Sequence, residues 1–286
     1  VIARENRMVV IQFASEEEAR QCMESLKEME HVSFVEMDEY NISSDTAGSS
    51  AGSLSQISSG FSYHTWGCED MGMDLLADYL STHALQQSAV VAVLDTGVLP
   101  VEGIRDRILS GTDVVMGGDG RNDLVGHGTH VSGTILDCTQ GLDVKILPVG
   151  IFGNNPYTST LNICTGLEYA IGQAPDVINM SLGGPITQED SLKQALIREA
   201  ISSGITVVVS AGNGDDAGIP QDTAGIMPPA MKECIVVGAV DQNHTIASFS
   251  NYGDSVDVCA PGVNITSYSI RPEGLESMDG TSMTAP

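Results

Sequence analysis

Three short segments of the chain carry residue types that together could perform acyl transfer. Asp95 follows the apolar run VVAVL (90–94). His127 lies in GHGTHVSGTI, among glycines that allow the backbone to approach closely, and Ser282 lies in GTSMTAP. A hydroxyl nucleophile, an imidazole that takes its proton, and a carboxylate that orients the imidazole are the groups that this chemistry needs.

Asp95-Thr96-Gly97 has an alternative interpretation, because it is also the signature of an aspartic protease. That chemistry uses two carboxylates about 3 Å apart that share a proton. A second such turn would be required, and Asp222-Thr223-Ala224 lacks the glycine. We therefore interpret Asp95 as an ionised carboxylate at the end of a strand, directed at a histidine.

The elements that must position these residues are strands and helices in alternation. Apolar runs predict strands over 90–94, 144–149, 176–180, 206–210 and 235–240, and helical patterns fall near 72–84, 127–137, 159–172 and 190–203. Strands that are apolar throughout and separated by helices indicate an α/β fold with a mostly parallel sheet covered on both faces. Functional residues of such sheets collect at the carboxyl ends of strands, where Asp95 and Asn213 lie.

The first 60 residues differ from the rest in composition. MVVIQF predicts a strand, residues 15–29 predict a helix with Ser15 as N-cap, and the alternation over 32–40 predicts a second strand. The following stretch is rich in Ser and Gly, as flexible linkers are. We predict a small α+β module over 1–44, a linker over 45–60, and a larger domain over 61–286.

Composition excludes several classes of partner. The chain of 286 residues has 12 Lys and Arg against 38 Asp and Glu, a net charge of −26, which repels nucleic acid and anionic membranes. No apolar run approaches the roughly 20 residues of a membrane helix.

The six cysteines are scattered without a CxxC motif, so we expect no zinc site. A disulfide is allowed, but the sequence does not assign its pairing. The chain does not begin with Met, and we treat its N-terminus as cut.

The segments VLDTGV, GHGTHVSGTI and GTSMTAP resemble the three active-site blocks of the subtilisin-like serine proteases (subtilases), in that family's order of Asp, His and Ser. DVINMSLGG (176–184) and VVVSAGNG (207–214) resemble the segments that border the family's specificity pocket. The segment 235–262 is also similar to the family sequence. The resemblance is strong over 85–286 and implies a three-layer subtilisin-like fold and serine endopeptidase activity on polypeptides.

Roles follow from the resemblance residue by residue. It implies that Ser282 is the nucleophile, His127 its general base, and Asp95 the residue that orients His127. Asn213 resembles the side-chain donor of the oxyanion hole, and His130 a structural histidine. The segments implied to bind substrate are Ser181, Leu182 and Gly183, which would pair with an extended peptide, and Ser210, Ala211 and Gly212, which would border the pocket.

The N-terminal module resembles the subtilase propeptide, which inhibits the enzyme by laying its tail through the cleft. The resemblance implies a proenzyme with an intramolecular inhibitor, cleaved between roughly Tyr40 and Gly60, and an extracellular or cell-surface location. A long helix is expected to begin at Ser282, so we expect 61–286 to be a catalytic domain truncated after the nucleophile motif and poorly active alone.

No cofactor is expected. The loop LDCTQGLDVKI is too short for the calcium loop of the secreted bacterial subtilisins, so no metal site is assigned and structural calcium stays open. We interpret the acidic residues Asp113, Asp119 and Asp123 as a solvated loop rather than a cation site.

Two other functions compete with a serine endopeptidase. A catalytically silent binding module on the same fold is disfavoured because Asp95, His127, Asn213 and Ser282 are all present. An esterase of the α/β-hydrolase type would need G-x-S-x-G and the chain order Ser, Asp, His. Ser282 lies in Gly-Thr-Ser-Met-Thr and fails both requirements.

Overall fold

The computed structural model describes residues 3–5, 8–29, 32–38, 40–43, 62–83, 88–186, 191–272 and 274–286. At its centre lies a seven-stranded sheet in the order β13-β12-β10-β8-β4-β6-β5, and every neighbouring pair in it is parallel. Its strands are β4 (Ala89–Asp95), β5 (Thr112–Asp113), β6 (Val144–Gly150), β8 (Val177–Met180), β10 (Thr206–Ser210), β12 (Ile235–Val240) and β13 (Val258–Pro261). The five predicted strands are confirmed to within one residue at either end.

Helices cover both faces of this sheet. Successive side chains of a strand point to opposite faces, so strands that are apolar throughout need helices on both sides. On β4, Val91 and Val93 belong to the apolar cluster that includes residues of α4 (His127–Cys138). Ala92 and Leu94 belong instead to the cluster that includes residues of α5 (Thr160–Gln173) and α6 (Leu192–Ser202). The predicted three-layer α/β fold is thereby confirmed.

Capping residues in the sequence mark the starts of α5 and α6. Ser159 caps α5, its hydroxyl accepting from the Asn162 N–H at 3.2 Å. Ser191 and Gln194 form a reciprocal capping box at the start of α6. Two further helices, α2 (Trp66–Asp70) and α3 (Met73–Thr82), precede β4.

The N-terminal segment folds only in part as its pattern predicts. β1 (Ala3–Glu5) and β2 (Met8–Val10) form an antiparallel pair, followed by α1 (Glu16–Lys27), which begins after the predicted N-cap Ser15. The strand predicted over 32–40 is wrong, since residues 32–38 form no strand. The strand lies instead at β3 (Tyr40–Ser43), whose hydrogen-bonding partners are strands more than 100 residues further along the chain.

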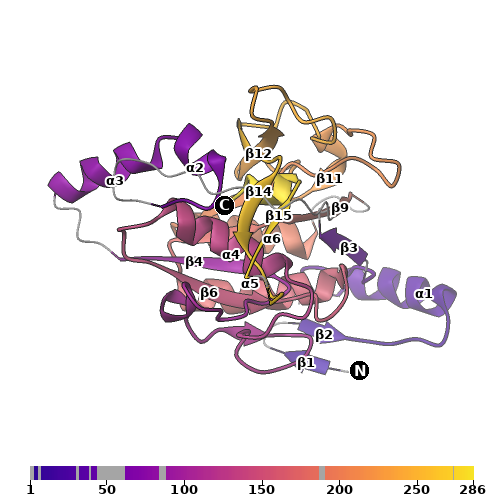
Figure 1. Cartoon of the computed structure of the whole chain (residues 1–286). Coiled ribbons are helices and arrows are strands. Elements are labelled where there is room, and N and C mark those ends of the chain that lie inside the picture. Colours follow the sequence, from indigo (N-terminus) through magenta and orange to yellow (C-terminus); the bar gives the residue numbers. More distant parts are fainter. Residues whose placement is uncertain are drawn as a thin grey trace.

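β3 lies within a second, four-stranded sheet in the order β11-β9-β3-β7. It pairs antiparallel with β7 (Tyr157–Ser159) on one side and with β9 (Leu182–Pro185) on the other. β11 (Ile226–Met227) completes the sheet. Figure 1 shows β3 beside β9, across the molecule from α2 and α3. The linker predicted over 45–60 lies outside the described residues.

The C-terminal part adds the antiparallel hairpin of β14 (Ile265–Tyr268) and β15 (Leu275–Met278), which packs on α4. A single 3₁₀ turn, η3 (Thr281–Met283), follows it. Within the described residues, no helix has both the length and the apolar character needed to cross a membrane.

Candidate active site

The centre of the site is a contact between the end of β4 and the start of α4. Oδ1 of Asp95 lies 2.6 Å from Nδ1 of His127, and the two side chains are only 1% and 4% exposed. The N–H of Thr96 donates to the same carboxylate oxygen at 2.6 Å. A carboxylate that accepts at Nδ1 fixes the ring orientation and tautomer of the histidine, so the other ring nitrogen is directed outward from Asp95.

A glycine allows α4 to start this close to β4. A Cβ on Gly128 would lie 2.1 Å from the carbonyl oxygen of Gly97 and 3.1 Å from Asp95. The backbone N–H of Gly128 donates instead to the hydroxyl of Thr96 at 2.9 Å. The helix start is thereby locked to the turn after β4, and this contact sets the separation of Asp95 and His127.

Asp123 reinforces the same junction and is a residue whose role the sequence interpretation missed. Its carboxylate accepts from the Thr96 hydroxyl (2.9 Å), from the N–H groups of Val125 (3.0 Å) and Gly126 (2.8 Å), and from both the N–H (2.9 Å) and the hydroxyl (2.6 Å) of Thr129. Burial raises its pKa, and the donated hydrogen bonds oppose that shift. A carboxylate placed just before a helix start was the available signal.

The interpretation of the acidic loop as solvated is therefore wrong for two of its three residues. Asp113 and Asp123 are 4% and 3% exposed, and only Asp119 is exposed. Asp113 accepts from the N–H groups of Val115 and Met116. Both carboxylates point inward, where backbone N–H groups of the loop and of the start of α4 donate to Oδ1 of Asp113 and to both oxygens of Asp123.

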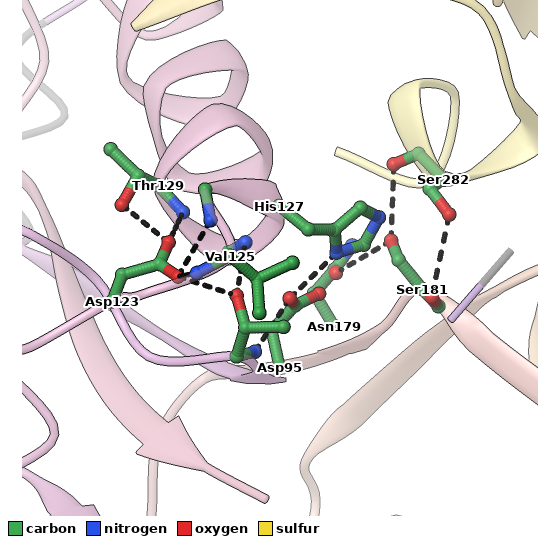
Figure 2. Close-up of polar contacts among 11 residues, drawn as sticks. Asp95, Asp123, Val125, His127, Thr129, Asn179, Ser181 and Ser282 are labelled. Atoms are coloured by element: carbon green, nitrogen blue, oxygen red, sulfur yellow. Dashed lines mark hydrogen bonds and ion pairs between the residues drawn. The ribbon is translucent and has the colours of Figure 1, made fainter. Parts of the chain in front are cut away.

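Ser282 lies on the opposite side of His127 from Asp95. Its hydroxyl donates to the carbonyl of Ser181 at 3.3 Å, and the Ser181 hydroxyl donates to the carbonyl of Ser282 at 3.0 Å. Figure 2 shows the His127 imidazole between Asp95 and the pair formed by Ser181 and Ser282. Ser282 belongs to η3, so it reaches this position by a tight turn.

Asn213 is joined to the residue before the serine. Its Oδ1 accepts from both the N–H and the hydroxyl of Thr281, each at 2.8 Å. Because the carboxamide is planar, this contact directs its Nδ2 donor away from Thr281. The N–H of Gly212 donates to the same threonine hydroxyl at 3.0 Å, which ties the segment after β10 to η3.

The order of strands in the sheet explains why these residues meet. β10, β8 and β4 are successive neighbours, and all three run in the same direction. Ser181 and Asn213 follow the carboxyl ends of β8 and β10, and Asp95 ends β4. Residues far apart in the chain therefore line one edge of the sheet, as the strand-end rule predicts.

The two predicted substrate-binding segments have different surroundings. Ser210, Ala211 and Gly212 are all buried. Asn251 holds the last two residues in place, because its Nδ2 donates to the Ala211 carbonyl at 3.0 Å and its N–H donates to the Gly212 carbonyl at 2.9 Å. The sequence interpretation assigned Asn251 no role. In the other segment, Ser181 and Leu182 are buried, and Leu182 and Gly183 already have a strand partner, because they pair with Ser43 and Ile42 of β3.

His130 has a structural environment. It is fully buried, and its Nε2 lies 3.1 Å from the carbonyl oxygen of Ile265 and 3.2 Å from that of Glu276. Both contacts are to carbonyls, so Nε2 carries the proton and donates to both. Burial, with a smaller contribution from His127, lowers the pKa of His130 to about 3. His130 therefore stays neutral and joins α4 to the C-terminal hairpin.

The parallel α/β sheet, with a buried Asp–His pair and a serine at its carboxyl edge, defines the class of serine proteases whose site lies on such a sheet. Residues 86–286 match the sequence profile of the subtilase family, peptidase S8. The chain belongs to the subtilase family and is a subtilisin-like serine protease.

Individual relatives agree with this assignment. Subtilisin DY from Bacillus licheniformis is 39% identical over 204 residues, which are 68% of this chain and 72% of that protein. The extracellular serine proteinase of Thermus sp. (strain Rt41A) is 35% identical over 230 residues, 78% of this chain and 54% of that protein. The crystal structure of a cold-adapted subtilisin-like serine proteinase superposes with a TM-score of 0.63 at 30% identity, covering 71% of this chain and 73% of the other.

Proposed function

We propose that Ser282, His127 and Asp95 form the catalytic triad of an endopeptidase. The observation that carries the proposal is the buried 2.6 Å contact of Asp95 with His127, with Ser282 on the other side of the imidazole (Figure 2). The serine hydroxyl attacks the peptide carbonyl while His127 accepts its proton and then passes it to the leaving amine. A water molecule then attacks the acyl-enzyme in the same way, with His127 again transferring the proton, and the acyl group is released. Asp95 stays ionised and stabilises the imidazolium that forms in between.

Asn213 is the side-chain donor to the oxyanion in this proposal. Thr281 holds the amide from its oxygen side, which directs Nδ2 away from Thr281. A donor that is already oriented needs no reorganisation as negative charge develops on the substrate oxygen. The backbone N–H of Ser282 supplies the second donor.

The chain as a whole acts as a proenzyme in which β3 occupies the position of substrate. β3 is inserted between β7 and β9 as an antiparallel strand, with Ile42 opposite Gly183 and Ser43 opposite Leu182. An extended peptide added to a sheet edge is the usual way in which main-chain hydrogen bonds hold a polypeptide for recognition. Residues 1–44 therefore act as an inhibitory module, with the tail in the cleft.

We place the protein outside the cytoplasm or at the cell surface. A relative that is 35% identical is named an extracellular serine proteinase. The net charge of −26 suits a protein that must stay soluble outside the cell.

A fluorophosphonate probe tests the triad, because it labels a serine only when that serine is activated as a nucleophile. The protein should be labelled once its N-terminal module is removed, and Ser282→Ala should abolish the label. Absence of labelling after removal of the N-terminal module would favour the binding-module alternative.

The same probe tests the proenzyme. Ile42→Pro removes an N–H from β3 and should increase the labelling rate at least about tenfold, because proline disrupts the strand pairing that fills the cleft. Ser33→Pro is the matched control, since residues 32–38 form no strand. Equal labelling of the parent, Ile42→Pro and Ser33→Pro would remove the basis for an inhibitory tail.

A further inference from the structure

A buried lysine contacts the side chain of the inhibitory strand. Lys193, in the first turn of α6, is only 5% exposed, and its Nζ donates to Oδ1 of Asn41 at 2.8 Å. Asn41, in the middle of β3, is 3% exposed. Its Nδ2 donates to the hydroxyl of Thr160, at the start of α5, at 3.1 Å. The oxygen and the nitrogen of this carboxamide therefore both have hydrogen-bond partners, in the first turns of α6 and α5.

The backbone around Asn41 is shaped for a short polar side chain. A Cβ on Gly184 of β9 would lie 2.7 Å from Oδ1 and 3.2 Å from Cγ of Asn41, so glycine leaves the space that the carboxamide fills. The preceding tail is anchored as well, because Asp38 accepts from the N–H of Leu161 at 2.9 Å. Asn41 is thus held in a defined recess and not at a loose surface.

We infer that Lys193 determines substrate specificity by selecting Asn or Asp at the position that Asn41 occupies. The inference rests on the proposed function, in which β3 takes the place of substrate. A side chain that fills the recess covers the Lys193 ammonium and displaces water from it. That side chain must therefore supply a hydrogen bond in place of the lost water. Asn and Asp present an oxygen at the right distance, and Asp adds an opposite charge. Leucine has a similar shape but leaves the ammonium without that acceptor, and lysine adds a like charge.

The test measures competitive inhibition of the activated protease by a peptide of residues 32–44. Peptides with Asn, Asp, Leu or Lys at position 41 are compared on one chromogenic substrate. We expect Asn and Asp to bind best and Leu and Lys to bind about 10- to 100-fold more weakly, the usual effect of losing a hydrogen bond to a buried charged group. In Lys193→Met the order of Asn and Leu should reverse. Lys145→Met, at a lysine that is 40% exposed, should keep the parent order.

The outcomes separate this inference from the proposed function. If no peptide inhibits, whatever residue stands at position 41, β3 does not occupy the substrate position. If all four peptides inhibit equally, β3 binds there but Lys193 selects nothing, and the inference is overturned. The peptide series on the unmodified enzyme decides this even if Lys193→Met does not fold.

An independent observation concerns two cysteines outside the site. The Sγ atoms of Cys68 in α2 and Cys138 at the end of α4 lie 2.8 Å apart, and Cys68 is fully buried. Asp137 lies beside them, with Oδ2 at 3.5 Å from the Cys68 sulfur. The hydrogen bond with Cys138, then burial and the nearby Asp137, raise the pKa of Cys68. Cys138 is the more accessible thiol of the pair, since it is only partly buried.

We propose that Cys68 and Cys138 form a disulfide when the protein folds in an oxidising compartment. The oxidant is a small-molecule or protein disulfide. The Cys138 thiolate attacks it to form a mixed disulfide and release one thiol, and Cys68 then loses its proton and displaces the second thiol. Two protein thiols are oxidised and one disulfide is reduced to two thiols. The bond ties α2 to the helix that begins with His127.

The Ser282→Ala protein, which cannot digest itself, is alkylated under denaturing conditions with and without prior reduction and then mapped by mass spectrometry. We expect a linked peptide pair containing residues 68 and 138, and a melting temperature that falls by about 4–12 °C on reduction or in Cys68→Ala. Cys259→Ala, at an exposed cysteine, should leave the melting temperature unchanged. Full alkylation of both Cys68 and Cys138 without reduction would overturn the assignment.

Discussion

The neutral, buried state of His130 should make the protein sensitive to acid. The folded protein binds a proton at this ring only near pH 3, whereas the unfolded chain binds it near pH 6.5. Between these values the unfolded state holds more protons, so the free energy of unfolding falls as the pH falls. The contribution is fully present above pH 6.5 and decreases by about 1.4 kcal/mol per pH unit below it, or about 3 kcal/mol between pH 6.5 and pH 4.

His130→Gln removes the titrating group while keeping an amide N–H that can donate to the carbonyls of Ile265 and Glu276. We expect it to be less stable than the parent at pH 7.5 by about 1–3 kcal/mol, because its shape fits the site less well. Below pH 6.5 its free energy of unfolding should nevertheless fall less steeply with pH than that of the parent. The difference in slope should correspond to about one proton. The difference in slope isolates His130, since all other titrating groups are common to both proteins.

The measurement is urea unfolding, followed by fluorescence of the single Trp66, at four pH values between 7.5 and 4.5 in the Ser282→Ala background. His83→Gln is the matched control, because His83 is exposed. Equal slopes for the parent and His130→Gln would refute the argument that His130 is held unprotonated by burial.

Three further predictions concern the site. Asp95→Asn should lower kcat by about 10⁴ with the fold intact, because the carboxylate that fixes the His127 tautomer is lost; active-site titration with peptide hydrolysis checks this. Asn213→Ala should lower kcat by about 10²–10³, the range typical of one oxyanion donor in this protease class, with little change in KM by steady-state kinetics. Gly128→Ala should destabilise the protein by about 1–3 kcal/mol or more in urea unfolding, because its Cβ would lie 2.1 Å from the Gly97 carbonyl oxygen. Gly172→Ala, which meets nothing within 4 Å, should be neutral or slightly stabilising, and equal behaviour of the two glycine variants would contradict the steric argument.

Local patterns were sufficient to predict five of the seven strands of the central sheet, all but β5 and β13. Apolar runs over five strands and the helical periodicity between them report burial on both faces, and burial of this kind is encoded within a few neighbouring residues. The placement of Asp95 and Asn213 at strand ends followed from the same pattern. The failure over 32–40 has the opposite cause, since alternation marks a strand but does not identify its partner.

The sequence by itself therefore determined the α/β class, the three motif blocks and the residue types of the chemistry. Only the tertiary structure decided which side chains meet, because those contacts join segments far apart in the chain. The burial of Asp123 depends on how α4 approaches the turn after β4, and the contact of Lys193 with Asn41 spans 152 residues. No local periodicity records a hydrogen bond across that separation. Such pairs arise only once the packing of the sheet and helices has fixed their distances.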